Sequence, residues 1–474
     1  MNVRIFPIDR IKKGSRVIIY GAGAIGKNFV RQIKEMDWCD VVAASDKCYE
    51  SISDFPAELI SPDSIADFYD YDYVIIAIEN HCTRRDAKEY LLASGVDSQK
   101  IIDNIDCFYK RDTFASVNRY GIVGTNGRED NRLHIAVNDI GSMGDLVISL
   151  KLYQSIVEYA PSSFIDVYVQ IPAVGSKVFW GQKNLREICD ISGGIDERKY
   201  DVIIEVRFEP LLLKCDFYAV NKLAPNLSEP MEKLLNYQER YYVKGDVYQY
   251  TNRVLHDRAL FLGLNRYTLF NISGAFDNIT DQNVKLHIDQ KFYVRYTELG
   301  LKDRYITYNY GANMLHGKDI PQTKMWPYEY HMEWNKRVKA LFPGVQIVQL
   351  GDRDVKRVPG ADVYVIDEDI EVAKLVLQNA LFHFDCEGGL VHIASQLGTK
   401  CFVVFGPTPV WFLGYEDNTN IAPVICGDCK GLYPDWYTVC HKYKKPKCMK
   451  SITVDRVIHE IEKWKRDRYV EFES

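Results

Sequence analysis

The sequence lacks the features that would place the protein in a membrane, outside the cell or on a nucleic acid. It has no run of about 18 apolar residues, so no transmembrane helix is expected. Residues 1–6 do not begin the apolar segment of a secretion signal. The formal net charge is −6, whereas a general nucleic-acid-binding protein would be basic. We therefore expect a cytoplasmic protein with no nucleic-acid partner.

Length and composition indicate a multidomain globular protein. The chain of 474 residues is long enough for two to four domains with substantial cores. Hydrophobic residues make up 47% and charged residues 26%, which is ordinary for such proteins. Strand and helix patterns alternate in three stretches, so the expected fold class is α/β. We place these stretches at residues 1–115, 131–300 and 301–474, with a polar, glycine-bearing segment at 111–131 between the first two.

The first stretch contains a glycine-rich turn between a predicted strand at residues 16–20 and a predicted helix. A second strand ends in an acidic residue about twenty positions further on, as in dinucleotide-binding fingerprints. The stretch is too short for a complete two-half dinucleotide fold. It could therefore bind a nucleotide or dinucleotide, or it could be a docking module whose glycines only serve the turn. The candidate residues are Gly21, Gly23, Gly26 and Asp46.

The second stretch opens with a strand at residues 133–137 and a helix at 146–159. The loop between them contains Gly141 and Gly144, which allow a tight turn, and Asp145 stands at the start of the helix. On these residues alone Asp145 could be an ordinary helix N-cap.

A glycine pair in the third stretch predicts an anion-binding turn. A buried strand at residues 381–384 should end in a carboxylate and two glycines before a helix begins. Glycines let backbone N–H groups approach a ligand closely, and a helix N-terminus favours an anion such as a diphosphate. The carboxylate would repel a phosphate directly below it, so we expect it to bind sugar hydroxyls. Alternatively, it is an N-cap followed by a helix-face histidine. The residues are Glu387, Gly388, Gly389 and His392.

Two further polar positions occur earlier in the third stretch. Lys324 precedes a Trp-Pro pair at the expected start of a helix, where a lysine alone would indicate only surface charge. Asp352 follows a strand at residues 345–350 and is a candidate for a ribose contact, as is Asp354.

Four elements, taken in order, resemble the signature of glycosyltransferase family 9, the lipopolysaccharide heptosyltransferase family. They are Gly144-Asp145, Lys324-x-Trp326-Pro327, Glu387-Gly388-Gly389-x-x-His392 and Phe405-Gly406-Pro407-Thr408. The resemblance covers about residues 133–464. Glu387 stands where the family usually has Asp, and Gly388 where it usually has Ser or Thr. The longer carboxylate could mean a donor sugar other than heptose.

The resemblance implies a GT-B fold, in which two Rossmann-like domains face a cleft, here preceded by the small N-terminal Rossmann-like unit. It also implies an inverting glycosyltransferase with Asp145 as catalytic base and Lys324 on the donor phosphates, and with no metal required for catalysis. The partners would be a nucleotide diphosphate sugar and a bacterial surface glycan such as lipopolysaccharide or capsule. A protein hydroxyl is the alternative acceptor. Such an enzyme could associate peripherally with the inner membrane.

Four of the twelve cysteines lie close together near the C-terminal end. Cys426 and Cys429 form a Cys-x2-Cys pair, and Cys440 and Cys448 follow at looser spacing. In some protein-modifying heptosyltransferases a comparable stretch resembles an iron-binding finger, so a structural Zn or Fe ion is predicted here. His441 could replace one ligand. The alternative is a loop with four reduced thiols.

Two other classes of function stay open. A dinucleotide-dependent sugar oxidoreductase would need a Tyr-x-x-x-Lys pair near the glycine turn. That spacing occurs at residues 218–222 and 443–447, both outside the first stretch. The other class is an inactive donor-binding scaffold, which the presence of both Asp145 and Lys324 argues against.

Overall fold

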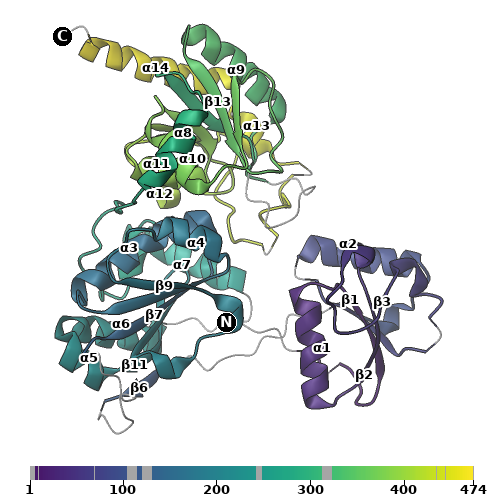
Figure 1. Ribbon diagram of the computed structural model, residues 1–474. Helices are drawn as coiled ribbons and strands as arrows, with labels where there is room; N and C mark the ends of the chain where they lie inside the picture. The colour runs from purple at the N-terminus through teal and green to yellow at the C-terminus, as the bar shows by residue number, and fades with distance from the viewer. Residues whose placement is uncertain are drawn as a thin grey trace. The chain divides into compact units, whose positions relative to one another are not determined.

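The computed structural model contains two compact units, Met1–Thr113 and Phe114–Ser474, drawn in Figure 1. They hold one five-stranded and two six-stranded sheets, which are almost entirely parallel. The predicted α/β class is therefore confirmed. The structure describes residues 6–8, 10–68, 70–78, 80–103, 115–119, 131–241, 248–311, 323–433, 435–443 and 445–472. Within these ranges no helix has the length and apolar character needed to cross a membrane.

The first unit is a parallel sheet in the order β3-β2-β1-β4-β5. Alternate residues of the central strand face opposite sides. Val17 and Ile19 pack with Phe29 of α1, and Ile18 packs with Leu91 of α2. The elements are β1 (Arg16–Tyr20), α1 (Ala24–Met36), β2 (Asp40–Ser45), β3 (Leu59–Ile60), β4 (Tyr73–Ile76), α2 (His81–Ala93) and β5 (Ile101–Ile102).

The second sheet has the order β6-β11-β10-β7-β8-β9, and only the β10–β11 hairpin is antiparallel. Its central strand β7 is buried along its whole length, and α3 packs on the face that carries Ile135 and Val137. The elements are β6 (Ser116–Asn118), β7 (His134–Asp139), α3 (Met143–Tyr159), β8 (Phe164–Val169), α4 (Pro172–Val178), β9 (Leu185–Asp190), β10 (Val202–Val206), β11 (Pro210–Asp216), α5 (Phe217–Leu223), α6 (Ser228–Tyr241) and α7 (Tyr248–Leu262). The short helix α8 (Tyr293–Glu298) packs instead on a helix of the third sheet, α10 (Ile370–Gln378).

The edge strand β6 extends this sheet upstream of residue 131. Asn118 donates to Oδ2 of Asp216 at 3.1 Å, and the guanidinium of Arg119 pairs with Glu232. These contacts tie residues 116–119 to the second unit. Most of the predicted linker at 111–131 lies outside the described residues.

The third sheet is entirely parallel, in the order β14-β13-β12-β15-β16-β17. Helices α9 and α14 cover one face, where Trp334 and Ile461 pack with Phe384, and α10 and α11 cover the other (Figure 1). The elements are β12 (Tyr305–Asn309), α9 (Tyr328–Leu341), β13 (Gln346–Gly351), β14 (Val363–Ile366), α10 (Ile370–Gln378), β15 (His383–Cys386), α11 (Gly389–Gln396), β16 (Cys401–Val404), α12 (Val410–Leu413), β17 (Thr419–Ile421), α13 (Lys447–Ser451) and α14 (Val454–Phe472).

A continuous hydrophobic core joins the second and third sheets through α3 and α11. A fully buried ion pair reinforces this junction. Nζ of Lys374 lies 2.8 Å from Glu371 and also donates to the carbonyls of Lys177 (2.7 Å) and His287 (2.8 Å). Because every proton of this ammonium has a partner, these contacts offset part of the desolvation penalty, although burial still lowers the pKa of Lys374. The two sheets therefore form one packed body.

Candidate functional site

Asp145 lies in the first turn of α3, at the edge of the second sheet where its parallel strands end. Its Oδ2 accepts hydrogen bonds from the backbone N–H (3.1 Å) and the hydroxyl (2.9 Å) of Ser142, forming a capping box. The N-cap of α3 is therefore Ser142, and Asp145 is the N3 residue of its capping box and not the N-cap itself. The same bonds hold a half-buried carboxylate where parallel sheets usually bind ligands.

Three predicted residues of the third sheet meet in one cluster. Nζ of Lys324 lies 2.5 Å from Oε2 of Glu387, and Oε1 of Glu387 lies 3.5 Å from Nε2 of His392. The other ring nitrogen of His392 is 2.8 Å from the hydroxyl of Tyr415, which is hydrogen-bonded to that of Tyr267. The side chains of Lys324, Glu387 and His392 are 14%, 6% and 4% exposed. The cluster is thus a buried polar chain at the start of α11.

The cluster holds its carboxylate in the charged form. Burial alone would raise the pKa of Glu387, but the ammonium of Lys324 and the imidazole of His392 hold it well below its usual range. Burial likewise opposes the charge on Lys324, and Glu387 raises the pKa of this lysine above its usual value. The two groups therefore form a charged pair.

The N-terminal turns of α3 and α11 touch at two glycines. A Cβ on Gly144 would lie 2.9 Å from Cδ2 of His392 and 3.3 Å from Cα of Gly389. A Cβ on Gly389 would lie 2.6 Å from the terminal methyl of Met143. Gly388, the N-cap of α11, has an extended backbone, and a Cβ there would make only an ordinary contact, 3.6 Å from the carbonyl oxygen of Cys386. The close contact explains why residue 144 is a glycine, and it brings two helix N-termini together beside Asp145.

The structure adds two basic residues that the sequence did not single out. Lys430 interacts electrostatically with the carboxylates of Glu387 and Asp145 and with the cations Lys324 and Arg266. Burial lowers the pKa of Lys430 to about 8, and both neighbouring cations act in the same direction. The guanidinium of Arg266 donates to the carbonyls of residues 207 and 208 at 2.9 and 3.2 Å. Lys430 is thus the residue whose charge links the two halves of the site.

Asp139, at the end of β7, is a second buried acid that the sequence did not single out. It is 2% exposed, and its Oδ1 accepts from the N–H of Gly141 at 2.9 Å. Its Oδ2 has no hydrogen-bond partner within the described part of the chain, because the nearby hydroxyl of Ser149 donates to the carbonyl of Asp145. Burial raises the pKa of Asp139 to about 6. Only its place at a strand end could have drawn attention to it.

Asp352 does not join the cluster. It lies in an exposed loop after β13, where its carboxylate accepts from the N–H of Asp354 at 3.1 Å. This is the geometry of a local turn. A ribose contact at Asp352 stays a prediction.

In the predicted nucleotide-binding turn of the first unit, the local backbone geometry requires glycine at two positions. Gly21 has φ +110°, and a Cβ on Gly26 would lie 2.0 Å from the carbonyl oxygen of Gly21. Gly23 is the N-cap of α1. The carboxylate of Asp46 accepts from the N–H groups of Ala22 (2.8 Å) and residue 48 (2.9 Å). Each feature has a structural role without a ligand, so nucleotide binding here stays a prediction.

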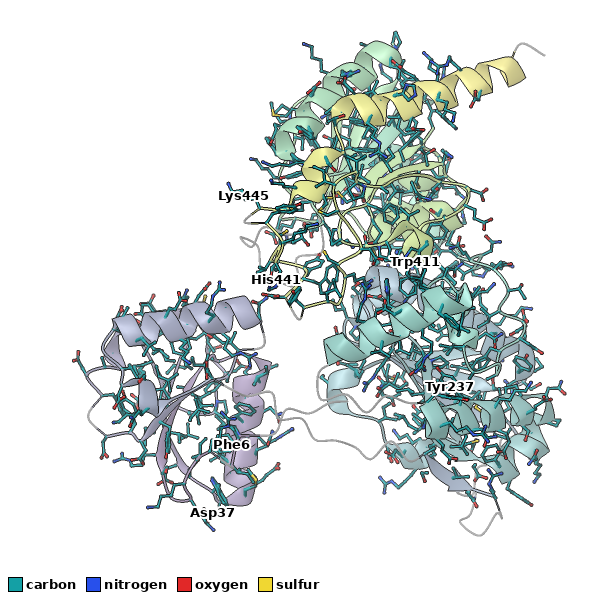
Figure 2. All side chains as sticks on the ribbon, turned by 180° about the vertical axis from the view of Figure 1, so that it is seen from behind. Phe6, Asp37, Tyr237, Trp411, His441 and Lys445 are labelled. Carbon is teal, nitrogen blue, oxygen red and sulfur yellow. The ribbon has the colours of Figure 1, made fainter. Side chains whose placement is uncertain are left out.

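Two cysteines of the predicted metal loop, Cys429 and Cys448, have a raised pKa. Burial is the main cause at both. Cys440 and Cys426 add to the shift at Cys429, and Cys426, Cys429 and Cys440 add to it at Cys448. Four thiols suit Zn or Fe chemically. Within the described residues no three of these sulfurs lie within 4.8 Å of one another, and a metal at this loop stays a prediction. His441 instead pairs with Asp435 and stacks on Tyr433, and Figure 2 labels it. Metal analysis of the purified protein tests the prediction.

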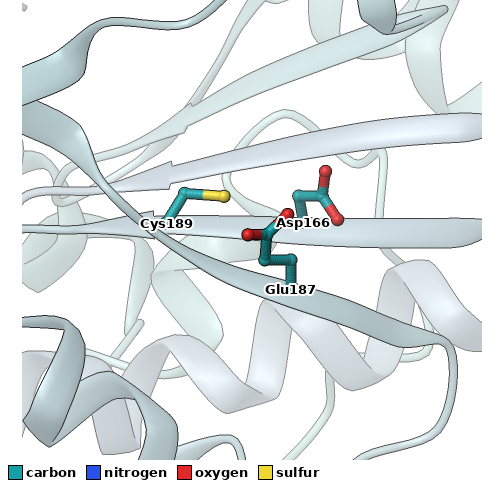
Figure 3. Close-up of side chains that lie close together, drawn as sticks. All are labelled: Asp166, Glu187 and Cys189. Atoms are coloured by element: carbon teal, nitrogen blue, oxygen red, sulfur yellow. The ribbon is translucent and has the colours of Figure 1, made fainter.

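One group of side chains does have ligand atoms within 4.8 Å of one another. Asp166, Glu187 and Cys189 lie together on β8 and β9, as Figure 3 shows. Asp166 is already paired with the guanidinium of Arg186 and accepts from Tyr200 at 2.6 Å. This ion pair accounts for the acid without a metal.

Comparisons with known proteins give one family match and several similar folds. Residues 13–102 match the family described as C2185-like, N-terminal. A family 9 glycosyl transferase from Veillonella parvula is 14% identical, with a TM-score of 0.43 over 70% of this chain and 99% of that one. The E. coli ADP-heptose LPS heptosyltransferase II is 15% identical, with a TM-score of 0.42 over 70% and 98% of the two chains.

A third similar structure is the iron-containing dodecameric glycosyltransferase TibC of enterotoxigenic E. coli. It is 11% identical, with a TM-score of 0.46 over 71% of this chain and 77% of that one. The search of curated proteins gave no match. At these identities and TM-scores, conclusions about function have to come from the chain's own residues.

Proposed function

We propose that the protein is an inverting glycosyltransferase that moves a sugar from a nucleotide diphosphate sugar to a hydroxyl group. The observation that carries this proposal is the contact between the starts of α3 and α11. It sets the half-buried carboxylate of Asp145 beside a buried Lys324–Glu387–His392 cluster. One half offers a base and the other offers positive charge and helix N–H groups, which are the two requirements of this reaction.

The groups divide the work as follows. The acceptor oxygen forms a bond to the anomeric carbon as its proton moves to the carboxylate of Asp145. The bond between that carbon and the diphosphate oxygen breaks, and its electron pair leaves with the nucleoside diphosphate. Lys324 and the N–H groups at the start of α11 offset the charge that develops on the leaving group. Glu387 accepts hydrogen bonds from hydroxyls of the donor.

For the acceptor, we propose a bacterial surface glycan such as lipopolysaccharide or capsule, with heptose or a related sugar as donor. A protein hydroxyl is the alternative acceptor. This assignment comes from the order of the four motifs. An enzyme with these substrates would act in the cytoplasm, next to the inner membrane.

Two experiments test the proposal. In a thermal-shift screen with ADP, GDP, UDP and CDP, at least one nucleotide should raise the melting temperature, because ligands that bind only the native state stabilise it. A donor-hydrolysis assay with the matching nucleotide sugar should then release the nucleoside diphosphate. A change in nicotinamide absorbance would instead indicate an oxidoreductase, and neither signal would indicate a scaffold.

A further inference from the structure

Lys430 differs from the other cation beside Glu387 in that its ammonium is not paired. Lys324 is neutralised by Glu387 at 2.5 Å. Lys430 lies near the carboxylates of Glu387 and Asp145, yet it forms no ion pair or side-chain hydrogen bond with any residue that the structure describes. The side chain of Lys430 is half-buried. An ammonium that is partly withdrawn from water and has no paired carboxylate is a favourable partner for an anionic ligand.

Three aromatic rings surround this ammonium. Nζ of Lys430 lies 5.4 Å from the ring centre of Phe208, 5.9 Å from that of Trp436 and 6.0 Å from that of Phe412. The faces of aromatic rings attract a cation without neutralising it. Phe208 and Phe412 also stack on each other, with centres 6.0 Å apart, although they belong to different halves of the second unit. The rings therefore hold the ammonium between the halves and leave its charge available.

The backbone of Lys430 is fixed on two sides. Its N–H donates to the carbonyl of Pro407 at 3.0 Å, next to the Phe-Gly-Pro-Thr turn. The guanidinium of Arg253, on α7, donates to the carbonyls of Asp428 (3.1 Å) and Lys430 (3.3 Å). The His256 ring of the same helix packs on Trp411, which Figure 2 labels. The segment is thus anchored to both halves.

We infer that Lys430 is a second diphosphate-binding residue, which contacts the leaving nucleoside diphosphate together with Lys324. This inference rests on the proposed function. A diphosphate brings more negative charge than one lysine can offset, and Lys324 must first be shared with Glu387. Lys430, whose charge interacts with the carboxylates of both Glu387 and Asp145, supplies the additional positive charge.

The test compares charge-removing and charge-keeping variants. Lys430→Met keeps the aromatic contacts and removes the charge, and Lys430→Arg keeps the charge. Binding is measured by calorimetry with the nucleoside diphosphate that stabilises the wild-type chain and with the matching monophosphate. Lys430→Met should weaken diphosphate binding about 10- to 100-fold, the value of a charge-assisted hydrogen bond, and monophosphate binding much less. Lys430→Arg should restore most of the affinity.

The control is Lys442→Met, an exposed lysine of the same loop, which should bind as the wild-type chain does. Equal affinity of Lys430→Met and wild type for the diphosphate overturns the inference. So does an equal loss for both nucleotides together with a lower melting temperature, which would mean a structural role. If Lys430→Met does not fold, Lys430→Gln is measured in the same way.

Different results would refute the proposed function and the role of Lys430. A wild-type chain that binds none of the four nucleotides removes the donor site itself. Loss of binding in Lys324→Ala but not in the Lys430 variants leaves the proposed function intact and removes Lys430 from it.

Discussion

Nζ of Lys324 lies 2.5 Å from Oε2 of Glu387, and both side chains are buried at the start of α11. Each is the other's main counter-charge. Removing either one leaves a buried charge without its partner, so the two residues have to be tested together.

We expect Lys324→Ala and Glu387→Ala both to weaken donor binding, but through different parts of the molecule. Lys324→Ala should affect the free nucleoside diphosphate and the whole donor equally, because the lysine addresses the phosphates. Glu387→Ala should affect the whole donor more, because the carboxylate addresses its hydroxyls. Titrations of the free diphosphate and the nucleotide sugar measure this difference. Unchanged affinities in both variants would refute the donor site.

The same pair predicts a coupling in stability. Each single variant should lose about 3–5 kcal/mol of unfolding free energy, the usual cost of leaving one buried partner unpaired. The double variant should lose less than the sum of the two single losses. Urea unfolding of the wild type, the two single variants and the double variant measures the interaction free energy between the two side chains. Additive losses would show that the ion pair does not form in solution.

Asp145→Asn should fold normally and lose about 100-fold or more in turnover. Asparagine keeps an oxygen that can accept from Ser142, so the capping box survives while the base is lost. Donor affinity should change little. Steady-state kinetics and calorimetry on the same preparation separate the two effects, and turnover near the wild-type value would remove Asp145 from the mechanism.

Asp139→Asn should stabilise the protein above neutral pH. The folded state raises the pKa of Asp139 from its ordinary 3.8 to about 6, so it binds this proton more tightly than the unfolded chain does. The stability that this proton provides is full below about pH 4 and is lost as the pH rises through about 6. An amide avoids that loss, which is about 3 kcal/mol at most. Melting temperatures of both chains should therefore agree near pH 4 and separate by pH 8 in favour of the variant. The opposite order would contradict the burial of a charge here.

A chain that begins at Phe114 should stay folded and keep donor binding. It retains β6, which pairs with β11, and the whole core shared by the second and third sheets. Loss of the first unit should instead affect oligomerisation, acceptor delivery or the response to a second nucleotide. Size-exclusion chromatography and diphosphate titration check this, and aggregation of the shortened chain would show that the two units share apolar surface.

The sequence predicted the site residues by two routes. Glu387 and His392 follow the end of β15, and a strand–turn–helix pattern already places such residues at the ligand-binding edge of a parallel sheet. Lys324 precedes α9 instead, and only the family resemblance pointed to it.

Lys430 could not be found by either route. It lies in an irregular loop, and in the sequence the cysteines of this loop suggested a metal site and nothing about Lys430. Its position depends on contacts with Pro407 and α7, which are far away in sequence. Asp352 is the opposite case, a residue predicted from its strand end that does not join the cluster. A strand end alone does not decide whether an acid points toward the site.

The contact between Gly144 and Gly389 sets the distance between the N-terminal turns of α3 and α11. A Cβ on Gly144 would lie 3.3 Å from Cα of Gly389, so the two helix starts are in close contact there. A methyl group added at residue 144 would also meet Cδ2 of His392 at 2.9 Å, and it would push the two helix starts apart. A transfer reaction depends on the distance between base and leaving group to within about an ångström. In the proposed reaction, the distance between the Asp145 carboxylate and the donor therefore depends on the close packing of the two helix starts at Gly144 and Gly389.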